Sequence, residues 1–187
     1  MKFNLVTKII AGITVCVSTI TLDSSVRASS QKYSCLEISE TQGIYSNTER
    51  GKINFLNFTR DVSEQWSIKN RCETVAERFQ RFYDSDVLRY IGASHVNDEP
   101  VLCAVVEKGN TCNSDNVLVT LPPNTDPIEG ARRLMDLRGL AAGRVISVNG
   151  KKGKVENYVD GVAYYDLEML EQLILETEDS DRLIPHE

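Results

Sequence analysis

Residues 70–83 read NRCETVAERFQRFY, and this stretch decides the fold. Apolar side chains recur in it at the i, i+3, i+4, i+7 spacing of a helix with one buried stripe: Cys72, Val75, Ala76, Phe79, Phe82 and Tyr83. Glu73, Glu77, Arg78 and Arg81 fall on the other side and face solvent. We place the helix start at Asn70, an asparagine N-cap with Glu73 closing a capping box.

Short strand patterns flank this helix. Before it, residues 33–38, 43–45 and 52–58 read as strands, with a turn at 47–51, and the lone Trp66 reads as a core residue. After it, residues 87–93, 101–106 and 116–121 read as strands, the first two joined by a turn at 95–100. Such short connections predict antiparallel pairing.

Two further helices are expected towards the C-terminus. Asp126-Pro127-Ile128-Glu129 begins one of them, with Gly139 at its end. Residues 144–148 and 154–159 suggest a hairpin across Asn149-Gly150, and Asp166 caps a short third helix. The pattern predicts a single α+β domain with an antiparallel sheet of about five to six strands and two main helices packed on it.

The N-terminus has the pattern of an export signal. Lys2 and Lys8 flank an uncharged run over residues 9–22, too short to span a membrane as a helix, and Val26-Arg27-Ala28 suits cleavage after Ala28. An uncleaved anchor is the alternative. We therefore divide the chain into a signal peptide (1–28), a globular domain (29–175) and an acidic C-terminal tail (176–187).

The charge of the chain excludes one class of partner. The formal net charge is −6 at pH 7, and removal of the lysine-containing signal makes it more negative. Such a surface repels phosphates, so nucleic acid is not an expected partner. An envelope protein or a membrane surface outside the cytoplasm remains as the expected partner.

Four cysteines remain after the signal: Cys35, Cys72, Cys103 and Cys112. Their wide spacing does not match zinc-chelating pairs, and an even number in an exported chain predicts two disulfides. Of the three possible pairings we favour Cys103 with Cys112, because only a short turn separates them. That choice pairs Cys35 with Cys72.

Residues suited to catalysis are scarce. His95 and His186 are the only histidines, and His186 lies beside the C-terminus. His95 with Asp98 and Glu99 offers one turn from which a hydrolase or a metal enzyme could be built, although a solvated hairpin tip fits the same residues. We assign no catalytic, cofactor-binding or metal-binding residue and expect no cofactor.

One basic cluster and the acidic tail are two further candidate sites. Lys151, Lys152 and Lys154 follow Asn149-Gly150 and suit either anionic headgroups or a solvated turn. The acidic run 176–181 lacks the ligand spacing of a calcium loop.

The chain resembles the circadian oscillating protein family of cyanobacteria. The residues that carry the resemblance are 70–80, 88–92, 100–104, Cys112 and 117–121. It covers Cys35 to about Arg138, departs from the family pattern between Thr41 and Trp66, and leaves 140–187 as an extension specific to this chain. The resemblance implies an exported protein, peripherally associated with a membrane, without known catalytic residues.

Our first hypothesis is therefore a non-catalytic binding or structural protein of the cell envelope. A protease inhibitor that presents the loop between Cys103 and Cys112 is the second. A hydrolase or metal enzyme built on the His95 turn is the third.

Overall fold

A computed structural model describes residues 31–58, 67–135, 146–148, 151–177 and 183–184. The signal segment and Trp66 lie outside the described residues. The helix predicted to end at Gly139 ends at Leu134, with Met135 as its C-cap, so that predicted end is wrong. The elements in chain order are β1 (Tyr33–Ile38), β2 (Thr41–Thr48), β3 (Gly51–Phe58), α1 (Ile68–Asp84), β4 (Tyr90–Val96), β5 (Glu99–Val105), β6 (Val117–Thr120), α2 (Pro127–Leu134), β7 (Ile146–Val148), β8 (Lys151–Gly153), β9 (Glu156–Val159), β10 (Val162–Asp166), α3 (Leu167–Thr177) and β11 (Leu183–Ile184).

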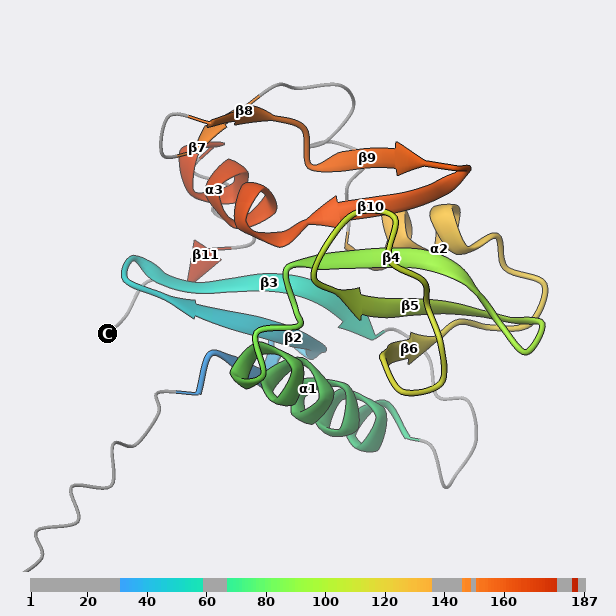
Figure 1. The fold of residues 1–187 in the computed structure, drawn as a ribbon. Coiled ribbons are helices and arrows are strands. Elements are labelled where there is room, and N and C mark those ends of the chain that lie inside the picture. Colours follow the sequence, from blue (N-terminus) through green and yellow to red (C-terminus); the bar gives the residue numbers. More distant parts are fainter. Residues whose placement is uncertain (1–30, 59–66, 136–145, 149–150, 178–182, 185–187) are drawn as a thin grey trace, which may run out of the picture.

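The described strands form two principal antiparallel sheets and one small hairpin. The first sheet has the order β1-β2-β3-β11, the second has the order β6-β5-β4-β10-β9, and β7 pairs with β8. Figure 1 shows α1 below the strands of the first sheet and α2 and α3 on the other side of the molecule. Buried side chains from both sheets and all three helices form one continuous core. The predicted α+β class is confirmed, with the strands divided between sheets where a single sheet was expected.

Helix α1 begins three residues earlier than predicted. The side chain of Ser67 accepts a hydrogen bond from the backbone N–H of Asn70 at 3.3 Å, so Ser67 is the N-cap and the asparagine cap is wrong. The predicted stripe from Cys72 to Phe82 is buried. Tyr83 is the exception, with 44% of its surface exposed.

The hairpin between β4 and β5 has a tighter turn than predicted. Asn97 and Asp98 have φ angles of 51° and 65°, the left-handed pair that a two-residue turn requires. The strands therefore extend to Val96 and from Glu99, and the predicted loop over 95–100 is wrong. His95 lies within β4, opposite Pro100.

The C-terminal part of the chain is integral to the second sheet. Strand β10 was not predicted, and it pairs with β4 on one side and β9 on the other. The predicted hairpin of 144–148 with 154–159 is also wrong, because β7 pairs with β8 instead. Asp166 does cap α3, accepting from the N–H of Met169 at 3.1 Å. Within the segment expected as a tail, β11 pairs with β3.

Both predicted disulfides are confirmed. Cys35 in β1 is bonded to Cys72 in α1, with their Cα atoms 5.5 Å apart, so this bridge ties the first strand to the helix that covers it. Cys103 in β5 is bonded to Cys112, with a Cα separation of 5.6 Å. The second bridge lies in a small apolar cluster with Tyr90 and Tyr164, separate from the main core.

Candidate binding groove

One side of α1, at the edge of its buried stripe, lines an open groove. Arg71, Thr74, Val75 and Arg78 follow one another at i, i+3, i+4 and i+7, so the helix places them in one row. Val75 is buried, whereas both arginines are half-buried. One wall of the groove is therefore a helix face that carries two guanidinium groups beside an apolar side chain.

The opposite wall comes from the β4–β5 turn and from the end of β6. The groove has a volume of about 680 Å³. Its residues on this side are Asp98, Glu99, Pro100, Val119, Thr120, Leu121, Pro122, Pro123 and Asn124. Pro100, Val119 and Leu121 are buried and Thr120 and Pro122 are exposed, so an apolar floor is bordered by a more polar rim.

Arg78 is held in place at this site. Its Nη1 atom donates to the carbonyl oxygen of Leu118 at 3.2 Å. The ion pairs among the described residues do not include Arg78, so no carboxylate of the described chain neutralises this half-buried charge. The guanidinium of Arg71 lies 5.4 Å from the centre of the Phe58 ring.

Strand β6, which borders the groove, is poorly suited to pairing with an added strand. It is the terminal strand of the five-stranded sheet and has only four residues. Its register against β5 shifts between Leu102 and Cys103. Such irregularities and short edge strands protect sheet edges from further pairing. A ligand in the groove therefore meets side chains more readily than a free strand edge.

Of the three residues of the predicted His95 site, Asp98 and Glu99 line the groove, whereas His95 is exposed and does not. Within the described part of the chain, no group of three His, Cys, Asp or Glu side chains is arranged to hold a metal ion. The turn therefore supplies acidic rim residues to the groove.

The loop between Cys103 and Cys112 is exposed but closed on itself. The N–H of Glu107 donates to Asn110 Oδ1 at 3.0 Å, and the N–H of Asn110 donates to the Glu107 carbonyl at 3.2 Å. The hydroxyl of Tyr164 donates to the Asn110 carbonyl at 3.0 Å. These bonds fold the loop over the outer face of the second sheet.

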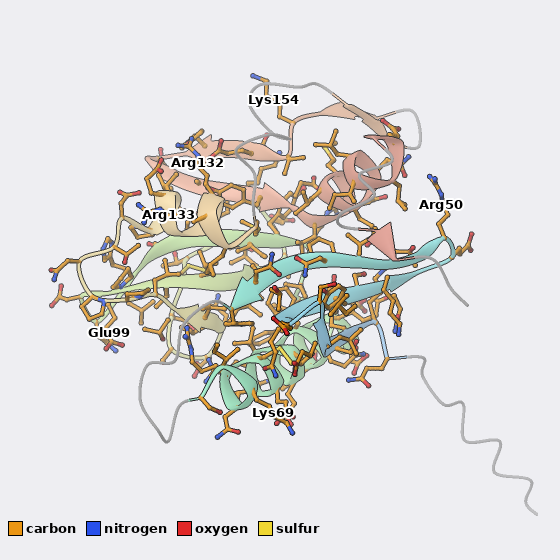
Figure 2. All side chains as sticks on the ribbon, turned by 180° about the vertical axis from the view of Figure 1, so that it is seen from behind. Arg50, Lys69, Glu99, Arg132, Arg133 and Lys154 are labelled. Carbon is orange, nitrogen blue, oxygen red and sulfur yellow. A yellow bond between two sulfur atoms is a disulfide. The ribbon has the colours of Figure 1, made fainter. Side chains whose placement is uncertain are left out.

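The other two charged segments are described only in part. In the basic cluster, Lys154 is exposed, and Figure 2 shows its side chain projecting from the edge of the molecule. The side chains of Lys151 and Lys152 and residues 178–182 of the acidic run lie outside the described residues.

A separate polar cluster joins α2 to the β9–β10 hairpin. The carboxylate of Glu156 accepts from Arg132 Nε at 3.0 Å, from the hydroxyl of Tyr158 at 2.9 Å and from that of Tyr165 at 3.0 Å. Burial acts to raise the pKa of Glu156, but these hydrogen bonds outweigh it and the net pKa is below its usual value. We interpret the cluster as a structural contact that holds α2 against the β9–β10 hairpin, rather than as a binding or catalytic site.

Sequence reasoning missed the groove because its walls come from distant segments. Arg78 was assigned to the solvent face of its helix, yet it points towards β6. One available indication was the helical spacing of Arg71, Thr74, Val75 and Arg78, which form a row at the edge of the core stripe. A second was Pro122-Pro123-Asn124, a rigid stretch that follows a strand.

Comparison with known proteins identifies a family. The family model described as circadian oscillating protein COP23 matches residues 32–172. Neither the curated proteins nor the solved structures gave a match. The matched range includes β9, β10 and most of α3, so the expectation that residues 140–187 form an extension specific to this chain is wrong.

Proposed function

The chain belongs to the circadian oscillating protein COP23 family, and from this premise we propose that it is an exported, non-catalytic binding protein of the cell envelope whose ligand occupies the α1–β6 groove. The observation that carries the proposal is the groove itself. It combines an apolar floor with two guanidinium groups, the mixture of anchoring and orienting groups typical of binding sites.

The two disulfides support a location outside the cytoplasm. Disulfides persist in oxidising compartments and are rare in reducing ones. The expected cleavage after Ala28 would release a mature chain that begins at Ser29. Any membrane attachment is then peripheral, and no helix in the described part of the chain is long and apolar enough to cross a membrane.

The composition of the groove supports binding rather than catalysis. Its charged residues are two arginines and the rim carboxylates Asp98 and Glu99. Arginine keeps its proton at any physiological pH and serves to position anions rather than to exchange protons. The closed turn at Glu107 and Asn110 makes the Cys103–Cys112 loop a weaker candidate for an extended inhibitory segment.

Site-specific photo-crosslinking in intact cells tests the proposal. A photoreactive residue at Thr120, exposed on the groove rim, is compared with one at Glu49, exposed between β2 and β3. We expect a discrete adduct from Thr120 alone, recovered with the envelope fraction after release of the cytoplasm.

The same sample gives the intact mass of the protein. A mass that begins at Ser29 supports export, and retention of Met1 contradicts it. Equal adducts at both positions, or none at Thr120, would rule out the groove as the ligand site.

A further inference from the structure

We propose that the α1–β6 groove takes an extended polypeptide segment that carries carboxylates, with Arg78 as the residue that selects for the negative charge. The inference rests on the groove being the ligand site of the proposed function. It adds the chemical class of the ligand and the residue that determines specificity.

Arg78 has donors to spare and no anionic partner in the described chain. A guanidinium offers five N–H donors in a planar fork, and the one described contact of Arg78 is to the neutral carbonyl of Leu118 at 3.2 Å. That hydrogen bond fixes the orientation of the guanidinium. Because the carbonyl is neutral, it does not neutralise the positive charge of the guanidinium. A ligand carboxylate would accept paired hydrogen bonds from the remaining donors, the strongest geometry available to arginine.

The second arginine lies further along the same wall. Arg71 and Arg78 are seven residues apart on α1, which corresponds to about 10 Å along the helix axis. An extended polypeptide covers that length with about three residues. A peptide lying along α1 can therefore reach both guanidinium groups with acidic side chains a few positions apart.

The apolar floor favours a peptide over a phosphate-rich ligand. Val75, Val119 and Leu121 form a buried apolar surface that suits aliphatic side chains. Asp98 and Glu99 stand on the rim and would repel an anionic bilayer as it approached the groove. A flexible chain can place its carboxylates at the arginines and avoid the acidic rim.

Side chains of the peptide, rather than its backbone, supply the recognition. The carbonyl of Leu118 in β6 already accepts a hydrogen bond from Arg78. The register shift opposite Leu102 further disrupts the strand edge. We therefore expect affinity to follow the acidic and aliphatic residues of the peptide.

Titration calorimetry on the disulfide-bonded protein tests this inference. The probe is a synthetic decapeptide in which glutamate alternates with valine, and its counterpart has glutamine in place of glutamate. In about 0.15 M salt, which screens long-range attraction, we expect the glutamate peptide to bind and the glutamine peptide to bind at least about tenfold more weakly.

Three variants assign the effect to Arg78. Arg78→Glu should abolish binding, and Arg78→Gln, which keeps an amide donor for the Leu118 carbonyl, should weaken it about tenfold or more. Arg133→Glu is the matched control because it changes the net charge as much as Arg78→Glu. Arg133 is exposed on α2, and Figure 2 shows it on the other side of the strands from Lys69 of α1. A thermal melt of each variant confirms that it is folded.

Several outcomes would overturn the inference. They are no binding of the glutamate peptide, equal binding of the glutamine peptide, or equal loss from Arg133→Glu and Arg78→Glu. Arg78-dependent sedimentation with phosphatidylglycerol vesicles, without peptide binding, would assign the groove to a membrane instead. A Thr120 adduct in cells without binding of the acidic peptide would retain the proposed function and reject only this ligand class.

Discussion

Gly92 of β4 lies directly against the sulfur of Cys103 on the neighbouring strand: a Cβ atom at position 92 would be 3.1 Å from Cys103 Sγ and 3.4 Å from Cys112 Sγ. The ring of Tyr164 closes the same space at 3.5 Å. The disulfide and the tyrosine therefore pack on the second sheet at a point where the strand has no side chain.

Gly92→Val should destabilise the fold through overpacking. We expect the free energy of unfolding to fall by about 1–3 kcal/mol, measured by urea denaturation. Ser94→Ala, two residues further along the same strand, is the control and should change little. In a Cys103→Ser/Cys112→Ser background the cost of Gly92→Val should shrink, because two smaller hydroxyls replace the bonded sulfurs. An unchanged cost would show that the disulfide is not what Gly92 accommodates.

Loss of Cys35 and loss of Cys72 should destabilise the fold by the same amount, because either change removes the same disulfide. Cys35→Ser and Cys72→Ser should each lower the free energy of unfolding by about 2–5 kcal/mol, and the double variant should cost little more than either single change. Urea denaturation under non-reducing conditions measures all three. Additive costs would mean that the two residues act separately.

Glu156→Gln should alter the dependence of stability on pH. The folded-state pKa of Glu156 is below its usual value, so its ionised form stabilises the fold above the unfolded pKa, and that contribution is lost as the pH falls through the folded pKa. We expect the variant to be less stable at pH 7 by about 1–3 kcal/mol and the difference to narrow below pH about 4.

Glu129→Gln is the control for Glu156, because Glu129 bonds to the same Arg132 at 2.7 Å but is 45% exposed. An exposed ion pair of this kind is worth about 0–1 kcal/mol. Urea denaturation from pH 3 to pH 7 compares the two variants. A constant difference across that range for Glu156→Gln would contradict the assigned role of its charge.

Ser67→Ala should weaken the start of α1. Loss of the hydroxyl that accepts from the Asn70 N–H should cost about 1 kcal/mol. Lys69→Ala is the control, since Lys69 is exposed and its ion pair with Glu73 is long, at 3.9 Å. Thermal unfolding monitored by circular dichroism compares the two. Equal melting temperatures of the two variants would show that Ser67 is not the N-cap of α1.

The sequence was informative where local chemistry alone decides structure. The helical stripe from Cys72 to Phe82, the Cys103–Cys112 bridge and the cap at Asp166 all follow from spacing within one segment, and the Cys35–Cys72 bridge was left as the remaining pair. The cap of α1 was misplaced because serine and asparagine are about equally good N-caps, and the choice depends on where the chain enters the helix.

Strand β10 could not be recognised from the sequence for a different reason. Ala163, Tyr164 and Tyr165 are consecutive and all buried, because β10 is covered on both faces and alternation disappears. The groove was missed because no local pattern brings Arg78 of α1 together with Leu118 of β6. That contact is a product of tertiary structure.

The position of β10 also sets the order in which the chain can complete its fold. As the polypeptide emerges from its N-terminus, β4 and β5 can pair early, but the other edge of β4 stays open until residues 162–166 have emerged. Sheets that depend on such distant contacts form slowly, because the chain loses the entropy of loop closure before strand pairing stabilises it. The nascent chain therefore carries an unpaired, apolar strand edge from the emergence of β4 until residues 162–166 follow, and a factor that keeps the chain from aggregating would act in that interval.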